Sequence, residues 1–165
     1  MEVILVSPLK PFRIIIAKTI PYLLVSLLNI VSILLLSVYV LDVPIVGSIW
    51  LLMAESTLFT ITSLSVGILI SNSAKTQQTA MFIALMSLFL PTLLFSGFLF
   101  PIENMPVPLQ VISNIVPSKW YYIIVKDIMI KGLGFGAVWQ ETMILVAMTT
   151  ALLAISIYKF KIRLA

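Results

Sequence analysis

Few side chains of this sequence can carry out chemistry, and one of them, Glu55, lies inside a long apolar run. The 165 residues include no Cys and no His, which excludes disulfides, Cys nucleophiles and His general bases and makes a zinc site improbable. No loop of the type G-x-x-x-x-G-K-[ST] is present to hold a nucleotide phosphate. We therefore expect no enzyme activity, no catalytic residue, no metal and no cofactor on this chain.

Glu55 allows two interpretations. It lies about nine residues from one end of its apolar run, which corresponds to a depth of roughly 14 Å in a membrane. An ionised side chain near the bilayer centre costs about 2.5–3.5 kcal/mol on insertion scales. Glu55 is therefore either a proton- or cation-binding site in a transport path, or a protonated or hydrogen-bonded carboxyl packed against Thr or Ser of a neighbouring helix.

Small and polar residues accompany Glu55 in the apolar runs. Four of them share one helical face of the same run, namely Ser56, Thr60, Ser63 and Gly67. Such a face is either a seam where helices approach closely or the wall of a polar conduit. Asn29 in the preceding run allows the same two interpretations. The candidate residues of a transport path are thus Glu55, Asn29 and Thr60.

The composition indicates a membrane protein. Hydrophobic residues make up 61% of the chain and charged residues 10%, whereas soluble domains carry about 25% charged residues. The net charge of +4 does not indicate a nucleic-acid partner, because the basic residues lie at the ends of apolar runs rather than in one patch. The lipid bilayer is the expected surrounding of most of the surface.

Apolar residues gather in four runs, 20–41, 46–70, 80–100 and 142–158. A spanning helix needs about 17–25 residues, and it must be helical because lipid offers no partner to backbone polar groups. We predict an all-α membrane protein, a single transmembrane domain over residues 1–165 with about four transmembrane helices. Pro91 lies inside the third run and is expected to distort its helix.

The distribution of Lys and Arg predicts the orientation. Seven of the 10 basic residues fall on one side of the four spans: Lys10, Arg13, Lys18, Lys75, Lys159, Lys161 and Arg163. The other three are Lys119, Lys126 and Lys131. Because basic loops stay in the cytoplasm, both termini are expected there.

Two segments outside the spans are themselves apolar. Residues 101–140, on the outer side, are divided by prolines and predict short helices that lie on or dip into the outer membrane face. Residues 1–13 combine apolar residues with a Pro-Lys-Pro break and basic residues. They predict either a short cytoplasmic helix or a frayed basic flank of the first span.

Several stretches resemble ABC-2 type exporter permeases, in the order that family has them. Residues 7–11 (Ser-Pro-Leu-Lys-Pro), followed by Lys18 and Pro21-Tyr22, resemble its "TPLKP…GK…PY" stretch. Residues 67–81 resemble its next cytoplasmic turn, and residues 91–106, with Ser-Gly-Phe-Leu-Phe-Pro-Ile, resemble its "P..L.SGF.FPI..MP" segment. Residues 115–121 and 130–134 match the patterns that follow, so the resemblance covers essentially the whole chain.

The resemblance implies a permease subunit of an ATP-binding-cassette exporter in the plasma or inner membrane. The implied partners are a separate ATPase subunit, which holds ATP and Mg, and a second permease chain. A cytoplasmic coupling helix within residues 1–13 would dock onto the ATPase through Pro8, Leu9, Lys10, Pro11 and Arg13. Short extracellular re-entrant helices before the last span would close the exit side, with Gly97, Pro101, Met105, Pro106 and Pro117 as their candidate residues.

The chain departs from the family in one respect. Family members usually have six spans, and this sequence resembles only the C-terminal portion with the last four. Two other functions therefore remain open. One is a small proton-coupled drug antiporter that uses Glu55, and the other is an inactive, truncated permease remnant.

Overall fold

The computed structural model describes residues 11–74 and 76–164, and all the regular structure in these ranges is helical. Two long helices come first, α1 (Pro11–Tyr39) and α2 (Ile49–Ser73). The third long helix is a continuous rod of α3 (Gln77–Ala84), a π-helical turn (Leu85–Phe89) and α4 (Leu90–Phe95). A 3₁₀ turn (Ile102–Asn104), α5 (Val107–Ser113), α6 (Pro117–Met129) and α7 (Phe135–Leu164) complete the chain.

Four helices are long and apolar enough to cross a membrane: Thr19–Tyr39, Ile49–Ser73, Gln77–Phe95 and Phe135–Ser156. This confirms the predicted all-α membrane protein. Two boundaries of these spans differ from the sequence prediction by five residues or more. The third helix ends at Phe95 rather than near residue 100, because Gly97 turns the chain with a φ of 86°. The last helix begins at Phe135 rather than 142, because Gln140 and Glu141 interrupt its apolar run without interrupting the helix.

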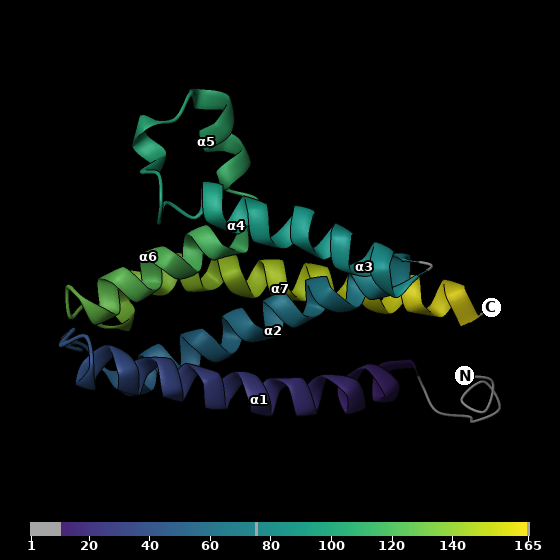
Figure 1. Cartoon of the computed structure of the whole chain (residues 1–165), viewed down its shortest axis with the longest axis horizontal. Helices are drawn as coiled ribbons and strands as arrows, with labels where there is room; N and C mark the ends of the chain where they lie inside the picture. The colour runs from purple at the N-terminus through teal and green to yellow at the C-terminus, as the bar shows by residue number, and fades with distance from the viewer. Residues whose placement is uncertain (1–10, 75, 165) are drawn as a thin grey trace.

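The helices pack around α2 and α7, which lie side by side (Figure 1). Helix α6 packs against both, α1 flanks α2 on one side, and the α3–α4 rod contacts α2 and α6 (Figure 1). Helix α5 stands apart from the bundle. The buried apolar core joins α2, α6 and α7 through Leu52, Ile124, Ile128, Val138 and Leu145.

Pro91 distorts its helix as expected. Proline lacks the backbone N–H, and its ring clashes with the carbonyl four residues earlier in a regular α-helix. The chain meets this constraint with the π-helical turn directly before Pro91, in which the N–H of Leu90 bonds to the carbonyl of Leu85, five residues back. The helix is widened at this point but continues to Phe95.

The loop between α1 and α2 is docked on the end of α6. The N–H of Val46 donates to the carbonyl of Met129 at 3.1 Å. A methyl group on Gly47 would overlap the backbone oxygen of Ile128, and one on Gly132, which has a φ of 66°, would lie 2.7 Å from Val46 Cγ1. Glycine is therefore required where these two turns touch.

We predict that Gly47→Ala destabilises the protein by about 1–3 kcal/mol, since the loop or the end of α6 must move to admit the methyl group. Gly134→Ala is the matched control, because an added methyl group meets nothing within 4 Å there. The measurement is unfolding of both variants in mixed detergent micelles. Equal stability of the two variants would contradict the close contact.

Candidate functional site: a buried polar seam between α2, α6 and α7

Glu55 is buried between α2 and α7, with 4% of its surface exposed. The hydroxyl oxygen Oγ1 of Thr142 lies 2.8 Å from Glu55 Oε1 and 2.9 Å from the backbone oxygen of Val138. The second carboxyl oxygen, Oε2, is buried and has no hydrogen-bond partner among the described residues. The structure therefore contains the contact expected in the second interpretation of Glu55, a carboxyl packed against a Thr hydroxyl of a neighbouring helix.

Side-chain contacts of Ser56 and Phe59 with Tyr121 join α2 to α6. The Ser56 hydroxyl donates to the backbone oxygen of Leu52 at 2.7 Å and lies 2.8 Å from the Tyr121 hydroxyl. The Tyr121 ring stacks on Phe59 with centroids 4.2 Å apart and planes inclined by 3°. Because the single hydrogen of the Ser56 hydroxyl serves the carbonyl of Leu52, the Tyr121 hydroxyl is the donor to Ser56, and burial raises the pKa of this phenol.

A third contact lies further along α2 and α7, where the Thr62 and Thr149 hydroxyls are 2.6 Å apart. The pairs 55–142 and 62–149 share a separation of 87 residues, so α2 and α7 run parallel and in register. Each helix advances seven residues between contacts, the period that keeps one seam facing a parallel neighbour. We call the following six residues the polar seam: Glu55, Ser56, Thr62, Tyr121, Thr142 and Thr149.

The sequence identified only part of this seam. Its expected face of α2 begins at buried Ser56 and ends at exposed Gly67, where nothing lies within 4 Å of an added methyl group. The partners on α7 were missed, although hydroxyls recur there every seven residues at Thr142, Thr149 and Ser156. This seven-residue repeat is the sequence pattern from which the partners on α7 could have been predicted.

The three candidate path residues are not brought together. Glu55 belongs to the polar seam, whereas the Thr60 hydroxyl bonds to the carbonyl of Ser56 in its own helix. Asn29 is exposed on α1. None of the three lines the open apolar groove of about 950 Å³ beside the α3–α4 rod. Its lining residues are Ser63, Gln78, Met81, Phe82, Ala84, Leu85, Leu88, Phe89 and Thr92.

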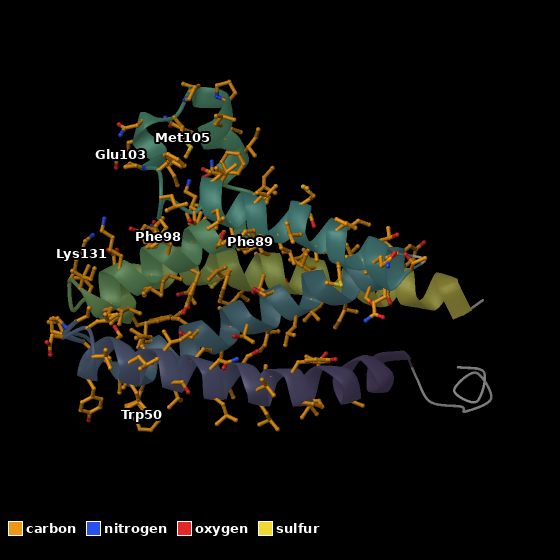
Figure 2. The ribbon with its side chains drawn as sticks, viewed as in Figure 1. Trp50, Phe89, Phe98, Glu103, Met105 and Lys131 are labelled. Carbon is orange, nitrogen blue, oxygen red and sulfur yellow. The ribbon has the colours of Figure 1, made fainter. Side chains whose placement is uncertain are left out.

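The expected exit-side residues lie in one connected segment after α4. Gly97 turns the chain so that an added methyl group would lie 3.3 Å from Ile102, and the next residue, Phe98, meets Tyr122 of α6 edge to face at 6.2 Å. Figure 2 shows Phe98 beside the bundle, with Glu103 and Met105 in the projecting hairpin. The segment is therefore anchored to α6 at its beginning.

The other exit-side residues shape local turns. Pro101 precedes the 3₁₀ turn, Pro106 precedes α5, and Pro117 is the first residue of α6. The backbone N–H of a first helical residue makes no hydrogen bond within the helix, so proline is tolerated there. The carbonyl of Met105 accepts a hydrogen bond from the Gln110 side chain at 2.8 Å. Each residue thus helps to fold the hairpin that α5 forms with its flanking turns.

Lys119 fixes the elbow between α5 and α6. Its Nζ donates to Ser113 Oγ at 3.2 Å and Asn114 Oδ1 at 2.6 Å, and it lies 5.1 Å from the centre of the Trp120 ring. Burial lowers the pKa of Lys119. The Trp120 indole donates to the carbonyl of Asn114 at 3.0 Å, which closes the same elbow. The sequence analysis did not identify this contact set.

The expected ATPase-docking residues fall mostly beyond what the structure describes. Pro8, Leu9 and Lys10 lie outside the described residues. Pro11 is the first residue of α1, and Arg13 follows within the same helix. Among the described residues there is no group of His, Cys, Asp or Glu that could hold a metal ion.

The four long apolar helices place this chain among the multi-pass helical membrane proteins. Comparison with known families then identifies the family. The profile described as "ABC-2 family transporter protein" matches residues 1–158, and the chain belongs to this family. The resemblance inferred from the sequence motifs is thereby confirmed.

Similar curated proteins carry related descriptions. The "Probable multidrug ABC transporter permease YbhR" of Escherichia coli (strain K12) is 30% identical over 164 residues, which are 98% of this chain and 44% of that protein. The "Probable multidrug ABC transporter permease YbhS" of the same strain is 32% identical over 132 residues, 80% of this chain and 35% of that protein. The "Inner membrane transport permease YhhJ" of the same strain is 32% identical over 162 residues, 98% of this chain and 43% of that protein. The chain thus spans less than half the length of these relatives, and no solved structure matches it significantly.

We predict that Tyr121→Phe lowers the free energy of unfolding by about 0.5–1.5 kcal/mol, since Ser56 loses a buried partner while the Phe59 stack remains. Tyr122→Phe is the control, because its hydroxyl makes no hydrogen bond within the described ranges. In a double-mutant cycle with Ser56→Ala, the coupling is expected to be ~0.6 kcal/mol. A coupling of zero would show that the hydrogen bond does not join α2 to α6.

Proposed function

We propose that this chain is a permease subunit of an ATP-binding-cassette exporter and moves a substrate outward across the plasma or inner membrane. The observation that carries the proposal is the family match over residues 1–158, supported by four helices suited to span a membrane. ATP hydrolysis takes place on a separate ATPase subunit, which holds ATP and Mg. Two permease chains form the path between them.

The arrangement of the helix ends supports an orientation. The beginning of α1, the turn between α2 and α3, and the end of α7 lie at the same end of the bundle (Figure 1). Seven of the 10 basic residues belong to these parts of the sequence or to residues 1–10. Because basic segments remain in the cytoplasm, this end faces the cytoplasm and the ATPase, and both termini lie there.

The packing supports a route for mechanical coupling. The coupling segment, residues 1–13, overlaps the beginning of α1 at Pro11, so a push by the ATPase reaches α1 first. Helix α1 packs on α2, and the polar seam ties α2 to α6 and α7. Helix α6 in turn contacts the exit-side segment through Tyr122 and Phe98. Motion of α1 is thereby passed to the re-entrant helices that close the exit.

Charge reversal of Lys10 and Arg13 tests the docking role. We predict that Lys10→Glu with Arg13→Glu weakens recovery of the ATPase at least several-fold when the tagged chain is purified from its native membrane. Lys126→Glu, an exposed basic residue at the opposite end of the bundle, is the control and should leave recovery unchanged. Unaltered recovery in the double variant would refute the docking role.

Burial of Glu55 favours one alternative, a small proton-coupled drug antiporter, because a carboxylate inside the membrane can exchange a proton for a cationic drug. Glu55→Gln discriminates between the two functions. On our proposal ATP-driven export continues at near the wild-type rate in membrane vesicles, whereas antiport would be abolished. A third outcome, no flux with ATP or with a proton gradient in the wild type, would indicate an inactive permease remnant.

A further inference from the structure

We propose that Glu55 is a proton-binding site, and that the bound proton forms the hydrogen bond that links α2 to α7 at Thr142. The ligand is a single proton, held in a closed helix interface. This goes beyond the proposed function, since an ATP-driven permease does not by itself require a protonated group. The inference rests on the burial of Glu55, on its contact with Thr142, and on the lack of an ion-pair partner and of a partner for Oε2 among the described residues.

The Thr142 hydroxyl has one hydrogen but lies at hydrogen-bond distance from two acceptors. Its Oγ1 is 2.8 Å from Glu55 Oε1 and 2.9 Å from the carbonyl oxygen of Val138. If Glu55 is ionised, both of these atoms are acceptors only, and the two contacts must share the one hydrogen of Thr142. If Oε1 of Glu55 carries a proton, it donates to Thr142, and Thr142 donates to Val138. Both contacts are then satisfied.

One hydroxyl hydrogen also serves two acceptors elsewhere in the structure, as at Thr150, whose Oγ1 lies 3.0 Å from the carbonyl oxygen of Val146 and 2.9 Å from that of Ala147. The Tyr121 hydroxyl donates to Ser56, and Ser56 donates to the carbonyl of Leu52, so two hydrogens serve two contacts. At the Thr62–Thr149 contact, two hydrogens serve three contacts: 2.6 Å between the hydroxyls, 2.9 Å from Thr62 to the carbonyl of Leu58 and 2.7 Å from Thr149 to the carbonyl of Leu145. Glu55 differs from these hydroxyls because, without a proton, its side chain would carry a negative charge inside the helix interface.

Among the residues that the structure describes, no positively charged side chain pairs with Glu55. Within residues 11–74 and 76–164 the structure gives Glu55 no ion-pair partner, and Lys119 of α6 donates instead to Ser113 and Asn114. Tyr121 of α6, a neutral phenol, is the titratable group that faces Glu55. On α7 the neighbour of Thr142 is Glu141, which is itself acidic. A buried negative charge without a counter-ion is unfavourable in such a site, whereas a neutral acid is not.

The unpartnered oxygen fits the same assignment. When Oε1 carries the proton, Oε2 is the carbonyl oxygen of a neutral acid. The free-energy cost of burying such an oxygen without a partner is far lower than that of burying an unpartnered carboxylate oxygen. The proton is therefore retained while α2 and α7 are packed together. It is released when water reaches this part of the interface, so the link between the two helices depends on protonation.

Infrared spectroscopy of the purified protein tests the proposal, in a detergent without ester or carboxyl groups. A protonated carboxyl has a C=O stretch separate from those of carboxylates and of the backbone. We expect one such band at neutral pH. It should be absent in Glu55→Gln and present in the matched control Glu141→Gln.

Thr142→Val provides a second readout that does not remove the carboxyl. Loss of the hydrogen-bond acceptor should move the band to higher frequency, and this result stands even if Glu55→Gln fails to fold. The proposal is overturned if the wild type has no band, if the band persists in Glu55→Gln, or if it does not move in Thr142→Val.

Discussion

The absence of a hydrophobic driving force between helices in lipid is the constraint on which this structure depends. Apolar side chains pack no better on one another than on lipid tails, so hydrogen bonds and close packing decide which helices associate. Here these interactions are concentrated at the junction of α2, α6 and α7. Each interhelical hydrogen bond contributes only ~0.6 kcal/mol, and the junction therefore relies on several in register with one apolar core.

The remaining elements are arranged around this junction. Helix α1 and the α3–α4 rod have extensive apolar surfaces exposed and few buried residues, whereas a third of the α2 span is buried. The α1–α2 loop and the exit-side segment both reach α6, the first through Val46 and the second through Phe98. Helix α6 therefore connects both of these segments to the polar seam, and in our proposal motion passes along this connection.

The sequence predicted the four spans because apolar runs of this length have few alternatives, and it predicted the family because its motifs are local. It could not predict the register of α2 and α7, that is, which residues of the two helices face one another. Glu55 was recognised as exceptional, but its partner Thr142 lies 87 residues away, and the choice depends on the packing of the core. The start of α7 at Phe135 was missed because Gln140 and Glu141 interrupt the apolar pattern. Likewise, the Lys119 elbow involves side chains whose contacts only the folded hairpin brings together.

The central claim, that α2 and α7 form one parallel pair in register, can be tested directly because the chain has no native Cys. Thr62→Cys combined with Thr149→Cys places two thiols where the hydroxyls are 2.6 Å apart, and oxidation in the native membrane should cross-link them within one chain. Gly67→Cys combined with Thr149→Cys should not cross-link. Failure of the 62–149 pair to react, or equal reaction of both pairs, would contradict the account.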